Sequence, residues 1–251
     1  MKTNIVFKSF GLVLALTAMQ ANAVIIEGHF TGNVRSFENG TDDGTFAGYW
    51  ENVSIGSVVS GSFWYDTSKA PADSSTSDYY AEYRSYTDDW MGSNFSVDGK
   101  TYHISDHVPL DGYVIKSEGL NLFDLETTPD YPYPARDTFY LFDNISSGGH
   151  QGGYKAIGLM VEVSREDKTL LDGLGIIQEF DWYDVGDPTS YAQAYISIGD
   201  STPNEMRASD AWVDISEIHV RIKNTTSVPE PSSFILFILT SSLLLARRQL
   251  K

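Results

Sequence analysis

The chain has no cysteine among its 251 residues. Disulfide bonds, thiol nucleophiles and thiolate metal sites are therefore excluded. The chain also lacks the HExxH zinc motif, the GxSxG nucleophile elbow and any internal repeat of fixed period. These absences exclude the α/β-hydrolase elbow and argue against zinc hydrolases, solenoids and β-helices.

Basic residues are scarce. The whole chain has 17 Lys and Arg against 34 Asp and Glu, a formal charge of −17, and residues 24–227 alone carry about −21. Such a charge repels nucleic acid and anionic lipid headgroups, so neither is expected as a partner. It suits divalent cations, a neutral glycan, or simply solubility outside the cell.

Acidic residues are so abundant that they indicate no catalytic site. A glycosidase needs only two suitably spaced carboxylates, and a sequence with 34 acidic residues meets that requirement by chance. We therefore expect a non-catalytic protein, and we keep a secreted glycan hydrolase as the less favoured alternative.

Alternation with a period of two runs through the body of the chain, and no helical stripe interrupts it. In residues 57–65, Val59, Gly61, Phe63 and Tyr65 occupy one face. Asp98-Gly99 separates two alternating runs, which is a strong hairpin signal. Further strands are expected at residues 24–34, 113–115, 120–125, 138–142, 157–163, 175–180, 192–198 and 218–222. The pattern predicts one all-β domain over residues 24–224, an antiparallel β-sandwich or jelly roll.

The N-terminus has the pattern of a secretory signal peptide. Lys2 and Lys8 precede an apolar stretch at residues 10–19, and a small-x-small site follows at Ala21 and Ala23. We expect residues 1–23 to be removed and the mature chain to begin at Val24.

The C-terminus combines three features in a fixed order. A Pro-Glu-Pro box is followed by an apolar run at residues 234–246 and by a basic end at residues 247–251. If the apolar run forms a helix, its length is less than the thickness of a bilayer core, which is about 30 Å. The basic end favours a cytoplasmic C-terminus, and the prolines keep the preceding strip extended.

This order resembles the PEP-CTERM sorting signal of exported bacterial proteins. The resemblance implies that a membrane-embedded exosortase recognises the box within the linker at residues 225–233 and removes the hydrophobic tail. An ordinary C-terminal membrane span is the alternative. The residues that carry the resemblance are Val228, Pro229, Glu230 and Pro231 for recognition, with Arg247 and Arg248 as the cytoplasmic stop.

Aromatic residues gather beside acids in several stretches, which can bind sugars through ring faces and carboxylate hydrogen bonds. The alternative is that these rings fill the core of a β protein. The candidate glycan contacts are Tyr79, Tyr80, Tyr83, Tyr86, Trp90 and Trp182.

Two acidic loops are candidates for calcium, which prefers several oxygen ligands. Neither fits the EF-hand pattern, and Asp is also a common turn residue. The candidate ligands are Asp42, Asp43, Asp181, Asp184 and Asp187. No other cofactor is expected.

These features together predict an exported, non-catalytic protein of the cell surface or extracellular matrix. It would pass through the inner membrane, meet the general secretion machinery and an exosortase, and bind exopolysaccharide. The alternatives are a secreted binding module for glycan, calcium or ice, or the hydrolase above. The body lacks a repeated Thr-x-Thr pattern, which argues against ice.

Overall fold

The computed structural model describes residues 24–39, 48–75, 77–86, 89–106, 112–127, 134–149, 153–202 and 205–223. The expected signal peptide, the Pro-Glu-Pro box, the hydrophobic tail, Asp42 and Asp43 all lie outside these ranges. The chain from Val24 to Lys223 forms one compact unit. No helix in the described part of the chain is long and apolar enough to cross a membrane.

The described residues form an all-β fold, as the alternating pattern predicts. Eleven strands make one antiparallel sheet in the order β3-β6-β7-β8-β10-β11-β1-β2-β4-β5, with β9 paired to β11. Besides strands, this part of the chain has one short 3-10 turn, η1 (Ile104–Asp106). The strands are β1 (Ile25–Asn39), β2 (Val58–Asp66), β3 (Tyr80–Ser85), β4 (Met91–Val97), β5 (Lys100–His103), β6 (Gly112–Leu125), β7 (Arg136–Gly149), β8 (Tyr154–Arg165), β9 (Phe180–Tyr183), β10 (Ser190–Thr202) and β11 (Glu205–Ile222).

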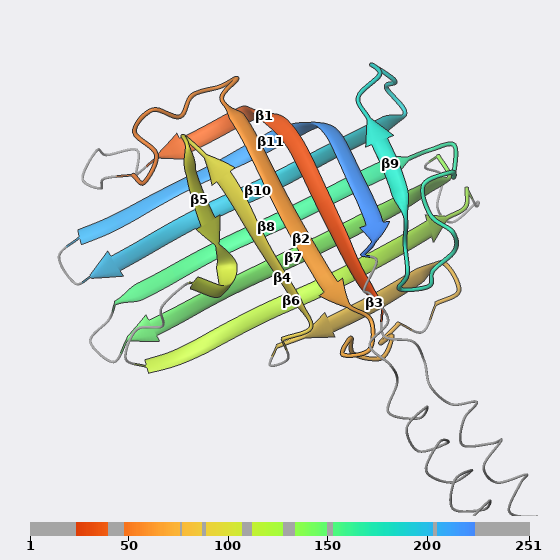
Figure 1. Ribbon diagram of the computed structural model, residues 1–251, viewed down its shortest axis with the longest axis horizontal. Helices are drawn as coiled ribbons and strands as arrows, with labels where there is room; N and C mark the ends of the chain where they lie inside the picture. The colour runs from red at the N-terminus through yellow and green to blue at the C-terminus, as the bar shows by residue number, and fades with distance from the viewer. Residues whose placement is uncertain are drawn as a thin grey trace, which may run out of the picture. The chain divides into compact units, whose positions relative to one another are not determined.

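The sheet curls because β1 and β11 are long and change neighbours along their length. The first half of β1 pairs with β2, whereas the first half of β11 pairs with β10. The β1–β11 register shifts at Thr31/Gly32 and Val34/Ser36, and such bulges bend a strand and increase its twist. The strands therefore divide into a wide half (β3, β6, β7, β8, β10 and the adjoining parts of β1 and β11) and a narrow half (β2, β4, β5, β9 and the rest). Figure 1 shows β2 and β4 crossing in front of β7 and β8.

The hydrophobic core lies between the two halves. The Phe63 ring of β2 stacks on the Phe139 ring of β7, with centroids 5.9 Å apart, and Phe180 of β9 meets Phe139 edge-on at 5.2 Å. Val59, Phe63 and Tyr65 are buried, which confirms the face assigned to this strand. Burying large side chains from both halves is what holds the curled sheet closed.

The hairpin expected at Asp98-Gly99 is confirmed. It joins β4 to β5, and both turn residues have positive φ, 53° at Asp98 and 71° at Gly99. A two-residue turn of this kind needs positive φ at both positions, which Asp and Gly tolerate better than other residues.

Three of the predicted strands differ from the structure. Residues 113–115 and 120–125 belong to one strand, β6, rather than two. The strand expected at 175–180 is wrong except for its last residue, because β9 begins at Phe180. The Gln178 amide donates to the carbonyls of Gly173 and Gly175 and accepts from the Asp172 N–H. These local bonds satisfy the backbone in a loop and replace a strand ladder.

Candidate functional site

Aromatic side chains gather on the outer surface of the wide half, where alternation would place polar residues. Leu141, Ala194 and Val213 point into the core, so their neighbours along each strand point outward. The outward positions carry large rings on three strands. The outer aromatic face consists of Tyr140 and Phe142 on β7, Tyr191 and Tyr195 on β10, and Trp212 on β11.

Three of these rings belong to one cross-strand row. Phe142 lies opposite Met160, Met160 opposite Tyr195, and Tyr195 opposite Trp212. The Tyr195 and Trp212 rings have centroids 5.1 Å apart and meet at 51°. The register therefore aligns ring and thioether groups across four adjacent strands, with Tyr195 and Trp212 partly exposed and Phe142 only 9% exposed.

Phe142 lies flat at the β6 end of this row. A Cβ atom at Gly119, directly opposite, would come within 2.3 Å of the Phe142 ring, so only glycine leaves room for it. The Arg84 guanidinium lies 5.3 Å from the centroid of the Phe142 ring and 4.8 Å from that of Tyr86. These contacts hold the ring against the sheet.

A hydrogen-bonded polar network runs beside the rings. The Tyr191 hydroxyl donates to Glu162 at 2.6 Å, and the Gln193 amide donates to the other Glu162 oxygen at 2.7 Å. Arg35 of β1 donates to Gln193 at 3.2 Å and to Asp214 at 2.9 Å. Its guanidinium also lies 5.7 Å from the Trp212 ring centroid. The network links β8, β10, β11 and β1, so its side chains are held in place before any ligand arrives.

A groove of about 270 Å³ opens at the β1 side of the outer aromatic face. Strand pairing places Ser36 opposite Trp212 and Glu38 opposite Asp210, so the groove combines aromatic walls with carboxylates. The residues that line it are Ser36, Phe37, Glu38, Tyr195, Asp210, Ala211 and Trp212.

Titration behaviour at the face follows from partial burial beside acids. Burial raises the pKa of Tyr195 to about 12, and the neighbouring Asp210 and Glu38 charges act in the same direction. Burial and the hydrogen bond to Glu162 likewise raise the pKa of Tyr191 to about 12. Both hydroxyls therefore stay protonated at neutral pH and remain hydrogen-bond donors.

The predicted glycan contacts near β3 divide between two surfaces. Tyr80 points outward and stacks on Phe123 with centroids 4.7 Å apart, at the far edge of the wide half. Tyr79 and Tyr86 flank β3 and are more than half exposed. Tyr83 turns inward instead, and its hydroxyl donates to the Leu174 carbonyl at 3.1 Å. Tyr79, Tyr80 and Tyr86 thus lie at or beside the outer surface, and Tyr83 does not.

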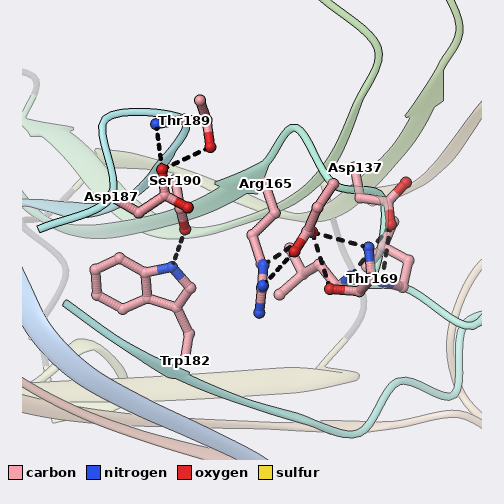
Figure 2. A network of polar contacts seen from close by, with 10 residues as sticks. Asp137, Arg165, Thr169, Trp182, Asp187, Thr189 and Ser190 are labelled. Atoms are coloured by element: carbon pink, nitrogen blue, oxygen red, sulfur yellow. Dashed lines mark hydrogen bonds and ion pairs between the residues drawn. The ribbon is translucent and has the colours of Figure 1, made fainter. Parts of the chain in front are cut away.

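Both tryptophans of the predicted glycan set are core residues, which corrects their assignment. Trp90 is 0% exposed and meets the Tyr65 ring edge-on, with centroids 6.2 Å apart. Trp182 is 4% exposed, and its indole N–H donates to the Ser190 hydroxyl at 2.6 Å, as Figure 2 shows. Neither ring offers a face to a ligand, because both are buried. Alternation along β9 turns Trp182 toward the core, whereas Trp90 is buried just before β4 begins.

Among the acids predicted to hold calcium, the three in the described ranges, Asp181, Asp184 and Asp187, are each bonded to other partners. Asp181 accepts from His219 and pairs with Arg221. Asp184 accepts the Gly186 N–H, and Asp187 accepts both the N–H and the hydroxyl of Thr189, a local turn visible in Figure 2. Within the described ranges, no group of three or more His, Asp or Glu residues is arranged to hold a metal ion.

A buried carboxyl pair lies at the end of the core. Glu118 and Asp143 sit opposite each other on β6 and β7, and each is at most 1% exposed. Ser93 of β4 donates to Asp143 at 2.7 Å, and Lys116 pairs with Glu118. Burial raises the pKa of Glu118 to about 7 and that of Asp143 to about 6, although Lys116 opposes both shifts. In this arrangement solvent and substrate do not reach the pair.

No protein-family model, curated protein or solved structure matches the chain. The class of protein is therefore defined by the fold and the site alone. It is an all-β protein, a curled antiparallel sheet with an aromatic and acidic outer face.

The residues of the outer aromatic face were missed from the sequence because their grouping depends on strand order. The signal available in the sequence was the set of residues that alternate with the apolar core residues along each strand. Tyr191 and Tyr195 alternate with Ala192, Ala194 and Ile196, so they occupy the solvent-facing positions of the strand, where polar residues are usual. Local clustering of aromatics along the chain was the weaker guide.

Proposed function

We propose that this chain is an exported, non-catalytic protein of the cell surface or extracellular matrix, and that it binds exopolysaccharide through its outer aromatic face. The observation that carries the proposal is the Tyr195–Trp212 ring pair beside the bonded Tyr191–Glu162–Gln193–Arg35 network. Ring faces pack against the C–H faces of sugars, and fixed polar groups beside them bind hydroxyls.

The curled sheet supports this proposal through its architecture. We place it with the β-sandwiches, in a jelly-roll-like arrangement, because its two halves pack face to face over one core. The wide half offers adjacent strands long enough for several sugar units side by side. Because the contacting side chains are already held by neighbours, little side-chain entropy would be lost on binding.

The proposed route out of the cell rests on the two ends of the sequence. The signal peptide at residues 1–23 directs export, and an exosortase recognises the box at Pro229, Glu230 and Pro231 and removes the tail. The mature protein is then delivered to the cell surface or the medium.

Replacing Trp212 with Ala tests the binding proposal. The full chain, purified in a detergent without a sugar headgroup, is titrated with the exopolysaccharide of an exporting host and with a panel of glycans. We expect saturable binding that weakens about tenfold or more in Trp212→Ala, because one aromatic platform is lost.

Trp64→Ala is the matched control, since Trp64 is an exposed tryptophan on β2 of the narrow half. Equal losses in both variants would argue against the outer aromatic face as the site. Absence of glycan binding by the unmodified chain would refute the proposed function itself.

Replacing Glu230 with Ala tests the sorting proposal independently of binding. We expect the tail to remain attached and the protein to accumulate in the inner membrane, because the recognition box loses its acidic centre. The mass and the cellular fraction of the mature protein report the result. Glu217→Ala, a change within the β domain, is the control, and normal processing of Glu230→Ala would contradict the sorting signal.

A further inference from the structure

The groove beside Tyr195 and Trp212 differs from the rest of the outer aromatic face in its charge. Glu38 and Asp210 lie directly opposite each other on β1 and β11, and both line the groove. Like charges in this position repel and destabilise a sheet. The sheet nevertheless places these two carboxylates side by side, next to the rings of Tyr195 and Trp212.

The neighbouring cations do not neutralise these carboxylates. Arg35 is bonded to Asp214 and Gln193, and Arg207 lies over the Tyr49 ring, 4.5 Å from its centroid. Among the ion pairs between described residues, none involves Glu38 or Asp210. Asp210 is instead hydrogen-bonded by the Tyr195 hydroxyl, which orients it within the groove.

The two rings supply the other half of the chemistry. Tyr195 and Trp212 meet at 51° with centroids 5.1 Å apart, so together they form an open corner rather than a closed stack. Aromatic faces attract cations, and they also pack against the apolar face of a sugar ring. A ligand that matches this groove therefore has a sugar-like body and a positive charge.

We propose that the groove binds an amino sugar with a free, protonated amine, as found in de-N-acetylated hexosamine polymers. The sugar ring packs in the corner of Tyr195 and Trp212, and its ammonium group lies between Glu38 and Asp210. This inference rests on the proposed function, because it specifies which polysaccharide the outer aromatic face selects.

Charge complementarity favours this ligand over the other polysaccharides. A uronic-acid polymer would bring carboxylates against Glu38 and Asp210, and the chain as a whole carries −17. A neutral sugar would leave both carboxylates unpaired in a partly buried site. An ammonium group removes their mutual repulsion, and the negative field of the protein attracts a cationic polymer from a distance.

The test compares three oligosaccharides of equal length with the same linkage: a glucosamine oligomer, its fully N-acetylated form and a glucose oligomer. Calorimetric titration of the full chain is done at a mildly acidic pH that keeps the amines protonated, with and without added salt. We expect the glucosamine oligomer to bind about tenfold more tightly than the other two, as two partly exposed ion pairs would provide. This preference should shrink as salt is added.

Substitutions locate the selectivity. Glu38→Gln and Asp210→Asn should each reduce the preference for the free amine and together abolish it, whereas binding of the glucose oligomer should change little. Asp172→Asn removes one exposed carboxylate that lies outside the groove and is the charge-matched control. Thermal unfolding of each variant checks that the fold is intact, and Glu38→Gln, on an exposed side chain, is the less disruptive of the two.

The outcomes separate this inference from the proposed function. Equal binding of all three oligomers would overturn the amino-sugar inference and leave a general glycan-binding face. Binding that requires calcium and loses it with Asp210→Asn would also overturn it, by assigning the carboxylates to a metal. Failure of every oligosaccharide, including the host polymer, would refute the proposed function and this inference together.

Discussion

Glu118 and Asp143 give the core a built-in dependence on pH. Burial raises both pKa values, to about 7 for Glu118 and about 6 for Asp143, against ordinary values of 4.5 and 3.8. The folded state therefore binds protons more tightly than the unfolded chain. Each group contributes stability that is fully present below its unfolded pKa and is lost as the pH rises through its folded pKa.

We expect the protein to be more stable at pH 5 than at pH 7.5, by about 2 kcal/mol for the coupled pair. Thermal unfolding across this range measures the difference. Other acids act in the opposite direction. A hydrogen bond with Lys116 lowers the pKa of Asp89, and hydrogen bonds with His219 and Arg221 lower the pKa of Asp181. Their contribution is lost only below about pH 4, outside this window.

Asp143→Asn provides the decisive comparison, because its amide oxygen can still accept the Ser93 hydrogen bond while no charge forms. The variant should show a flatter dependence of melting temperature on pH between 5 and 7.5. Asp172→Asn, on the surface, should keep the slope of the parent protein. An unchanged slope in Asp143→Asn would show that this carboxyl does not titrate in the window.

At the scale of elements, the bend in β1 and β11 decides the architecture. Gly32 lies at one of the two register shifts between β1 and β11, beside the Asp214 carbonyl. A Cβ atom at Gly32 would come within 2.4 Å of that backbone oxygen. Because the oxygen belongs to the paired strand, it cannot move without disturbing the ladder.

We expect Gly32→Ala to lower the free energy of unfolding by about 2–3 kcal/mol, the usual cost of overpacking a rigid site. Denaturant unfolding with an unchanged m-value would measure it. Gly175→Ala is the matched control, since nothing lies within 4 Å of a Cβ atom there. Similar effects of the two substitutions would mean that the close approach at the bulge carries no strain.

Comparison of the elements with the sequence shows which strands and turns local patterns predict and which they do not. The Asp98-Gly99 hairpin and the buried face of β2 followed from turn chemistry and alternation, because both are local. The length of β1 and β11 could not be predicted in this way, since a β-bulge lets a strand continue beyond the point where its alternation breaks. Residues 175–179 have strand-like composition, yet the Gln178 amide holds them in a loop.

At the scale of the whole molecule, negative charge dominates the surface. The described ion pairs are mostly on exposed side chains, so each contributes little, whereas the repulsion among excess acids extends over the whole domain. We expect the melting temperature to rise by several degrees when sodium chloride is raised from about 10 mM to 0.5 M, because salt screens the repulsion.

Calorimetry at neutral pH would measure this shift. Sucrose at a concentration that gives the same osmolality serves as a control for general solute effects. A fall in melting temperature with salt would mean that the surface ion pairs outweigh the net repulsion.

The amino-acid sequence by itself determined the all-β class, the main hairpin, the acidic surface and the absence of thiol chemistry, because each depends on local pattern or composition. It also predicts the export and sorting signals at the two ends, through short linear motifs.

Which aromatic residues face solvent together was decided only by tertiary structure. One groove is shared by Tyr195 of β10, Trp212 of β11 and Glu38 of β1, because strand order and register bring these distant segments side by side. The register shift at Val34/Ser36 determines which β1 side chains lie on the outer face. Alternation tells the two faces of a strand apart, but only packing decides which face becomes core, and so Trp90 and Trp182 are buried while Trp212 is not.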